Sequence, residues 1–283
     1  MGSAPGTLAI IAGRDDLPRL IAEAARDEAA PYLVISFPAD TQDWMAEHPH
    51  QEHEYEKPAR LFRALRGAGV TDVVFAGATA RPQLRPWRFD HGALTVAPKV
   101  LKLLRRGDDG LLSGLARIFE AEGFRMRGAE ECLPGLAIQP GVATRAQPSD
   151  VDRQDASIGA AILRDLGPHD VGQAVVIARG LCLGLEAIEG TDALLSRIAE
   201  LPPERRRRAP PPAGVLVKLP KPGQDRRVDL PTIGARTVEG AAEAGLSGIV
   251  VEAGGANLLD RRETIGAADR LGLFLWAARE GEL

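Results

Sequence analysis

The sequence predicts a protein of the α/β class with two domains. Short, continuous apolar runs alternate with stretches of helical periodicity along most of the chain. Continuous apolar strands that are separated by helices are typical of a parallel sheet covered on both faces. The alternation lapses once, in a stretch rich in proline and glycine, and 283 residues suffice for a core on each side of it.

The first domain is expected over residues 1–135, as a Rossmann-like open parallel sheet. Its strands are the apolar runs 8–12, 32–36 and 71–76. Glycine follows the first run at Gly13 and the third at Gly77, as is usual where a strand ends in a tight turn. Apolar residues at helical spacing predict four helices in this domain, at 17–25, around 61–65 behind Pro58, at 96–104 and at 111–122.

The second domain is expected over residues 149–283 and carries the catalytic function, with residues 136–148 as a linker. We expect the ligand cleft between the two domains. This half is also α/β, but its helices and strands alternate less simply. The predicted helices are 149–166, 191–201, 237–244 and 261–270, and the predicted strands are 173–178, 181–188, 214–219, 248–251 and 273–277.

Composition excludes several classes of protein. The net charge is −4, with 30 arginines against 5 lysines, which indicates compositional bias and gives no support for a nucleic-acid surface. There is no run of 18 apolar residues and no basic leader segment, so we expect a soluble, cytoplasmic chain. Cys132 and Cys182 fit no metal-binding spacing and are expected to be small buried side chains. His48, His50 and His53 are expected in an exposed acidic loop without a zinc motif.

Two loops of the first domain could bind an anion. The segment Gly13–Pro18 joins a strand to a helix and presents free backbone N–H groups, although Asp15 or Asp16 could simply cap that helix. The loop from Gly77 to Pro82 contains Ala80 and Arg81, and Arg81 could clamp a phosphate with two hydrogen bonds. Ligands collect at the carboxyl ends of strands in open α/β sheets, so the two loops define a candidate crevice.

The densest polar segment lies in the second half, from Lys218 to Gly234. It follows an apolar strand, and its prolines and glycines predict a stiff loop that holds polar groups in place. Its lysines and arginines suit a diphosphate, and a carboxylate there could hold Mg²⁺ together with phosphate oxygens. An ordinary exposed loop, with Asp229 as a turn former, is the alternative. The polar side chains of this segment include Lys221, Gln224, Asp229 and Thr232.

Two further clusters have open interpretations. In the segment Glu186–Asp192, Thr191 or Asp192 could be a helix N-cap or could contact the same ligand. The run Arg205–Arg208 is either a solvated loop or a contact for an acidic headgroup.

A series of short motifs, in one order over essentially the whole chain, resembles the LpxI family, the UDP-2,3-diacylglucosamine pyrophosphatases of lipid A biosynthesis. The most specific motifs are Lys221-Pro, Val228-Asp-Leu-Pro-Thr-Ile-Gly234, Glu189-Gly-Thr-Asp192 and Asp170-Val-Gly-Gln173. Phe75-Ala-Gly77 with Arg81-Pro82, Gly107-Asp-Asp109 and Glu122-Gly-Phe124 add to the resemblance.

The resemblance implies a hydrolase that cuts the pyrophosphate of UDP-2,3-diacylglucosamine into UMP and 2,3-diacylglucosamine 1-phosphate (lipid X). It implies a divalent cation, usually Mg²⁺, and assigns to Asp229 the family's essential acid, which would bind the metal and support attack by water. The substrate would be met at the inner membrane, with which the protein would associate peripherally, and a homodimer stays open. The substrate-binding residues expected from both arguments are Asp15, Asp16, Ala80, Arg81, Thr191, Asp192, Lys221, Gln224 and Thr232.

Two other functions remain open from the residues alone. One is a hydrolase or transferase that acts on another nucleotide sugar. The other is a non-catalytic sensor that binds a nucleotide or a lipid.

Overall fold

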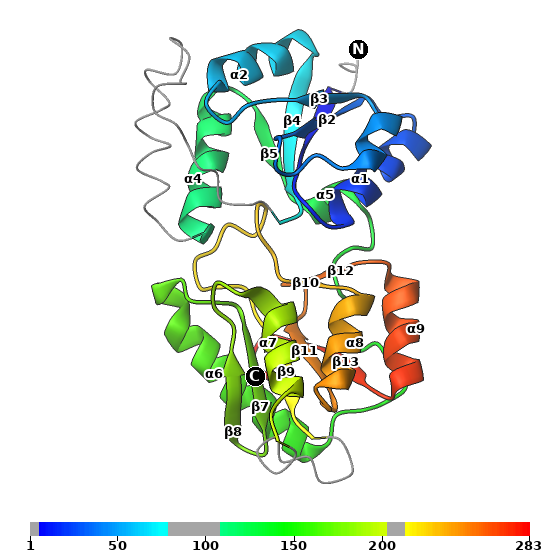
Figure 1. Cartoon of the computed structure of the whole chain (residues 1–283), viewed down its shortest axis with the longest axis vertical. Helices are drawn as coiled ribbons and strands as arrows, with labels where there is room; N and C mark the ends of the chain where they lie inside the picture. The colour runs from blue at the N-terminus through cyan, green and yellow to red at the C-terminus, as the bar shows by residue number, and fades with distance from the viewer. Residues whose placement is uncertain (1–5, 79–107, 203–212) are drawn as a thin grey trace. The chain divides into compact units, whose positions relative to one another are not determined.

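The computed structural model describes residues 6–78, 108–202 and 213–283 (Figure 1). The chain forms two compact units. Unit 1 comprises residues 1–134 and a separate short segment, Asp225–Asp229, and unit 2 comprises residues 135–224 and 230–283. Within the described ranges, no helix has the length and apolar character needed to cross a membrane.

Unit 1 contains a five-stranded sheet in the order β3-β2-β1-β4-β5, and all of its strand pairs are parallel. Because the chain moves outward from β1 to β3 and then returns to the other side of β1, the strand order reverses between β1 and β4. The described elements of unit 1 are β1 (Thr7–Ala12), α1 (Leu17–Asp27), β2 (Tyr32–Ser36), the 3₁₀ helix η1 (Asp43–Glu47), β3 (His50–Glu52), α2 (Pro58–Gly67), β4 (Val70–Ala76), α4 (Asp108–Ala121), β5 (Arg125–Arg127) and α5 (Ala129–Cys132).

Helices cover both faces of this sheet. Ala9, Ile35 and Val73 share a buried cluster with side chains of α2 and α4, such as Phe62 and Phe119. Successive residues of a strand point to opposite faces, so neighbouring residues such as Ile10, which is fully buried, face the other side, where α1 packs against β1 and β2. Burial on both faces explains why these strands are continuous apolar runs in the sequence.

Unit 2 contains a six-stranded mixed sheet in the order β6-β13-β11-β9-β7-β8. Strands β9, β11 and β13 are parallel, whereas β7 runs antiparallel to β9 and forms a hairpin with β8. The described elements of unit 2 are β6 (Gly141–Val142), α6 (Asp150–Leu166), the 3₁₀ helix η4 (Gly167–His169), β7 (Ala174–Ala178), β8 (Leu181–Leu185), α7 (Gly190–Ala199), β9 (Val215–Lys218), β10 (Thr232–Ile233), α8 (Ala235–Glu243), β11 (Gly248–Glu252), β12 (Asn257–Leu258), α9 (Arg261–Leu271) and β13 (Phe274–Ala278).

This sheet is also the middle layer of three. Its alternate side chains divide between two buried clusters, one with Leu194 of α7, Val238 of α8 and Ala267 of α9, the other with Ala156 and Ala160 of α6. In Figure 1, α7, α8 and α9 lie side by side within unit 2. Strands β10 and β12 form a separate two-stranded parallel sheet beside the main one.

The α/β fold class predicted from the sequence, with a parallel sheet in the first part of the chain and a second α/β part, is confirmed. The apolar strands and the long helices appear within a few residues of their predicted bounds, except for the predicted helix at 96–104, which lies outside the described residues. The elements that the pattern missed are short, such as β3, β5, β10 and β12, because two or three residues carry no readable periodicity.

Two features of the division were not expected. Residues 136–148 contribute to unit 2, since Ile138 lies in its core and β6 pairs with β13. The segment Asp225–Asp229 belongs to unit 1, although the chain on either side of it belongs to unit 2.

Candidate active site

In unit 1, the loops after β1 and β4 are joined by backbone hydrogen bonds at the carboxyl edge of the sheet. The N–H of Gly13 donates to the carbonyl of Ala76 at 2.8 Å, and the N–H of Arg14 donates to the carbonyl of Ala78 at 2.7 Å. The approach leaves no room for a side chain at Gly77, where a Cβ would lie 2.2 Å from the Arg14 carbonyl oxygen. This is the point where the strand order reverses, the usual ligand-binding position in open α/β sheets.

The Asp15 carboxylate is used to fasten the same two loops. One oxygen accepts the N–H of Leu17 at 3.0 Å, and the other accepts the N–H of Ala78 at 3.2 Å. Loss of hydration raises the pKa of the Asp15 carboxyl, and the two N–H donors offset this only in part. Asp16 occupies the N-cap position of α1, but its side chain pairs with Arg19 at 3.2 Å. Asp15, rather than Asp16, therefore satisfies a free N–H group at the start of the helix.

Several predicted site residues fall outside the described part of the chain. They are Ala80, Arg81 and the run Arg205–Arg208. Their roles remain predictions.

In unit 2, a buried carboxylate organises the start of α7. Glu186 follows β8 and is 7% exposed. One of its oxygens accepts the hydroxyl of Thr191 at 2.6 Å, and the other accepts the N–H of Gln173 at 2.9 Å. The expectation that Thr191 or Asp192 is the N-cap is wrong, because the N-cap residue of α7 is Glu189. Thr191 instead ties the helix to Glu186.

Asp192 lies in the first turn of α7 and faces outward. Its carboxylate accepts a hydrogen bond from Arg236 of α8 at 2.5 Å, and both side chains are largely exposed. An exposed pair of this kind contributes little to stability and can exchange partners readily.

The loop after β9 brings three predicted residues together in unit 2. Lys221 forms an ion pair with Asp170, and its backbone N–H donates to Gln224 Oε1 at 2.8 Å. Gln224 is buried, so this loop is held from within as its prolines and glycines predicted. Asp170 has a φ of +54° and belongs to the motif Asp170–Gln173 that precedes β7. Two motifs about fifty residues apart in the sequence therefore meet at Lys221.

Lys218 links the end of β9 to β10. Its side chain is buried, and its Nζ donates to the carbonyl of Thr232 at 2.9 Å. Thr232 in turn lies opposite Asn257 in the two-stranded sheet. A buried ammonium group is costly unless it is hydrogen-bonded, so this contact fixes where the polar loop leaves the core.

Two buried side-chain oxygens of unit 2, in the part of the chain that the structure describes, have no hydrogen-bond partner. They are Gln173 Oε1 and Asn257 Oδ1. Both belong to the segments just described, since Gln173 follows Asp170 in its motif and Asn257 lies opposite Thr232. An unpaired buried acceptor carries a desolvation cost that a donor from a ligand could offset. Neither oxygen is predicted as a site group from the sequence.

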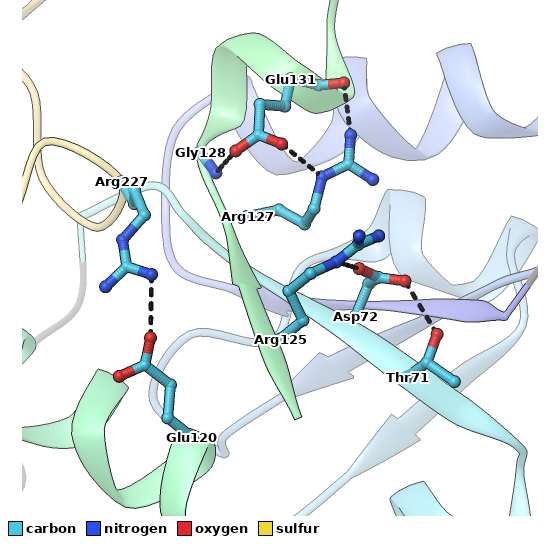
Figure 2. Close-up of polar contacts among 8 residues, drawn as sticks. All are labelled: Thr71, Asp72, Glu120, Arg125, Arg127, Gly128, Glu131 and Arg227. Atoms are coloured by element: carbon cyan, nitrogen blue, oxygen red, sulfur yellow. Dashed lines mark hydrogen bonds and ion pairs between the residues drawn. The ribbon is translucent and has the colours of Figure 1, made fainter. Parts of the chain in front are cut away.

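The segment Asp225–Asp229 carries the predicted catalytic acid into unit 1. Val228 is buried in the same cluster as Phe119 and Phe124, and Arg227 donates to Glu120 of α4 at 2.8 Å (Figure 2). Asp229 itself is half-buried. The sequence placed Asp229 with Lys221 and Thr232 in one domain, whereas the structure assigns Asp229 to unit 1 and the other two residues to unit 2.

The described residues contain no complete set of protein ligands for a metal ion. Among residues 6–78, 108–202 and 213–283, no group of three or more His, Cys, Asp or Glu side chains is arranged to hold one. Mg²⁺ commonly binds through one or two carboxylates plus substrate phosphates and water. A single half-buried carboxylate at Asp229 fits a cation that arrives with a phosphate ligand, and does not make a cage by itself.

Comparison with known proteins agrees with this set of motifs. The model of the LpxI N-terminal domain matches residues 7–136, and the model of the LpxI C-terminal domain matches residues 139–276. The chain belongs to the LpxI family. It is also 38% identical to the UDP-2,3-diacylglucosamine pyrophosphatase LpxI of Caulobacter vibrioides, over 95% of this chain and 96% of that protein. The resemblance seen in the sequence is thereby confirmed.

In this LpxI protein, the polar motifs of unit 2 contact one another, as Lys221 does Asp170 and Glu186 does Gln173. The sequence predicted Lys221, Gln224, Thr191 and Thr232 as site residues. Glu186 and Asp170 belong to segments that it also singled out, but their bonds to Thr191 and Lys221 were not predicted. Both acids lie in glycine-containing segments next to apolar strands, and this position was the sequence feature that could have indicated their role.

Two expectations about other side chains are wrong. Cys182 is exposed because it lies on β8, at the edge of its sheet. Cys132 is half-buried. The histidine segment is not an exposed loop, since His50 lies in β3 and His53 is buried.

Proposed function

We propose that this LpxI protein hydrolyses the pyrophosphate bond of UDP-2,3-diacylglucosamine in lipid A biosynthesis. The products are UMP and 2,3-diacylglucosamine 1-phosphate (lipid X). The observation that supports this most strongly is the match to both LpxI domains, in order, together with 38% identity across nearly the full length of the Caulobacter enzyme. In the reaction, water adds to one phosphorus, the P–O–P bond breaks, and the bridging oxygen leaves with the other phosphate.

Asp229 is the proposed catalytic residue. Its carboxylate is suited to hold Mg²⁺ and to orient the attacking water, and the cation would supply charge neutralisation on the diphosphate. Lys221, Gln224, Thr191 and Thr232 offer donors for the substrate's phosphate and sugar oxygens. The further proposed substrate-binding residues are Asp15, Asp16, Ala80, Arg81 and Asp192.

We place the reaction at the cytoplasmic face of the inner membrane, with the protein associated peripherally. Each acyl chain of the substrate gains about 0.8 kcal/mol per methylene that it buries in a bilayer, so the substrate resides in the membrane. A protein that takes up such a lipid must reach the bilayer surface.

The decisive assay measures UMP release from UDP-2,3-diacylglucosamine in detergent micelles, with Mg²⁺ or with EDTA, and with UDP-N-acetylglucosamine as the competing substrate. We expect UMP from the diacylated substrate with Mg²⁺, loss of release with EDTA, and recovery on adding Mg²⁺ back. Preference for the unacylated sugar would instead favour an enzyme for another nucleotide sugar. Binding without UMP release in either buffer would favour a sensor.

Asp229→Asn tests the catalytic residue. It removes the charge and keeps the shape, so we expect kcat to fall at least about 100-fold with the melting temperature nearly unchanged, as for loss of a group that acts on the transition state. Asp269→Asn, which alters a carboxylate paired with Arg145 in unit 2, is the matched control and should keep normal kcat. More than a tenth of wild-type turnover in Asp229→Asn would refute the role of Asp229.

A further inference from the structure

The chain enters unit 1 for five residues and then leaves it again. Gln224 belongs to unit 2, Asp225–Asp229 belongs to unit 1, and Leu230 belongs to unit 2 again. A five-residue excursion of this kind has few contacts with which to hold its place. Two contacts of its own side chains, Arg227 with Glu120 and Val228 with the buried cluster, attach it to unit 1.

The first source of order is a hydrogen-bonded turn within the segment. Asp225 Oδ1 accepts the backbone N–H of Arg227 at 3.1 Å and its Nε at 3.0 Å, while Oδ2 accepts a terminal guanidinium N–H at 2.7 Å. The backbone N–H of Val228 donates to the carbonyl of Asp225 at 3.0 Å, which closes the turn. The hydrogen bonds from Arg227 hold the pKa of the Asp225 carboxyl below its usual value, so the carboxylate is charged at neutral pH.

The second source of order attaches this turn to unit 1. The remaining terminal nitrogen of Arg227 donates to Glu120 Oε1 in the last turns of α4, at 2.8 Å (Figure 2). The adjacent Val228 is 7% exposed and lies in the buried cluster of unit 1. The Arg227 guanidinium therefore bonds to Asp225 within the turn and to Glu120 of α4 at the same time.

Only arginine can make this arrangement. Its planar guanidinium presents five N–H donors in a fixed fork, so that Nε and one terminal nitrogen can grip Asp225 while the other reaches Glu120. A lysine carries the same charge at a single point and cannot span both carboxylates in this geometry.

We propose that Arg227 is a positioning residue for Asp229, which it holds on unit 1 through Asp225 and Glu120. The proposal rests on the proposed function, in which Asp229 is catalytic. Asp229 directly follows the buried Val228, and its own N–H points to the Asp225 carbonyl at 3.4 Å. Release of Arg227 would free the turn that fixes the Asp229 backbone. A displacement of about 1 Å at a catalytic group can lower a rate about 100-fold.

The experiment compares Arg227→Met and Arg227→Lys with the control Arg66→Met. Arg66 also belongs to unit 1, but it pairs with Glu122, two residues beyond Glu120, rather than with a residue of the segment Asp225–Asp229. We measure kcat and KM for UMP release from UDP-2,3-diacylglucosamine, together with thermal unfolding. The expected result is a fall in kcat of about 10- to 100-fold in both Arg227 variants, a KM within about 3-fold, and near-normal kcat in Arg66→Met.

Arg227→Lys separates positioning from charge. If the positive charge alone mattered, lysine would restore kcat, and full activity of Arg227→Lys would overturn the proposal. Equal losses of kcat in Arg66→Met and Arg227→Met would also overturn it, since the effect would then follow general destabilisation of unit 1.

Glu120→Gln provides a second variant in case Arg227→Met does not fold. It removes the charge that anchors Arg227 to α4 and keeps the shape, so we expect a smaller fall in kcat, about 3- to 10-fold, at unchanged KM. Wild-type kcat in Glu120→Gln and in the folded Arg227 variants would refute the positioning role. Absence of UMP release from the wild-type protein would instead refute the proposed function.

Discussion

The five-stranded sheet of unit 1 and the six-stranded sheet of unit 2 fix the loops at their strand ends in different ways. In unit 1, the loops after β1 and β4 are joined mainly by backbone hydrogen bonds, with Gly77 in close contact with Arg14. In unit 2, side chains join the polar segments, as Lys218 at the end of β9 bonds to Thr232 and Glu186 after β8 bonds to Thr191. Side-chain donors and acceptors can exchange partners with a ligand, whereas backbone bonds between loops hold a scaffold in place.

This difference also shows where a sequence carries its information. Where two loop backbones approach as closely as here, there is no room for a side chain, so the contact is visible in the sequence as glycine at the ends of apolar runs, at Gly13 and Gly77. A side-chain contact requires two particular residues that are distant in sequence. Substitutions in each unit test whether the two edges are held as described.

The largest effect on stability is expected for Gly77→Ala in unit 1. Gly77 has a φ of +82°, and the new Cβ would lie 2.2 Å from the Arg14 carbonyl oxygen, so the two loops would have to separate. The strain and the lost backbone bonds together predict a loss of about 2–4 kcal/mol in the free energy of unfolding, measured by chemical denaturation.

Gly69→Ala is the matched control for this substitution. Gly69 also has a positive φ, +68°, but the nearest atom to a Cβ there is Thr7 Oγ1 at 3.9 Å. It should lose only about 1–2 kcal/mol, the cost of the left-handed backbone. If both variants lose the same free energy of unfolding, the close approach of the two loops contributes nothing to stability. The proposed difference between the backbone contacts of unit 1 and the side-chain contacts of unit 2 would then be wrong.

An intermediate effect is expected for Glu186→Gln in unit 2. Both carboxylate oxygens of Glu186 accept hydrogen bonds, from Thr191 and from the N–H of Gln173. A glutamine has one acceptor oxygen, so its NH₂ group must face a donor, which predicts a loss of about 1–3 kcal/mol. Hydrogen exchange of the β7 amides should report this loss in unit 2.

Glu189→Gln gives the background for that measurement. Glu189 pairs with Arg197 at the surface, where an ion pair contributes less than about 1 kcal/mol. Equal protection of β7 in the two variants would show that Glu186 does not hold the loops of unit 2 together.

The smallest effect is expected from mild acid and is confined to unit 1. Burial lowers the pKa of His48, His50 and His53, so their neutral forms are favoured in the folded state. Their contribution to stability is complete above the unfolded pKa of about 6.5 and decreases as the pH falls below it, because the unfolded chain then binds more protons.

Lowering the pH from about 7.5 to 5.5 should therefore weaken amide protection in β2 and β3 by a small amount, equivalent to a few degrees of melting temperature. His50→Asn, which removes the imidazole that contacts Ser36 Oγ at 2.8 Å, should reduce this pH dependence. An unchanged pH profile in the variant would locate the effect elsewhere in unit 1.

Much of the fold could be read from the sequence, and rather less of the site. The runs 8–12, 32–36 and 71–76 predicted β1, β2 and β4 because each is buried on both faces. Lys221 and Gln224 were predicted to lie in one stiff loop, and they do. Asp170 was recognised only as part of a motif, because nothing in its local sequence shows that Lys221 is its partner.

The sequence alone determined the α/β class and, through the order of its motifs, the LpxI family. The tertiary structure alone decided which unit holds Asp229. Periodicity shows which face of its own helix or strand a residue lies on, and this is a local property of the sequence. Arg227 and Glu120 are 107 positions apart, and their contact depends on the path of the chain through both units. The segment that carries Asp229, which the sequence places beside Lys221 and Thr232, is therefore bonded to α4 through Arg227. The Arg227 variants will test what this attachment does for Asp229.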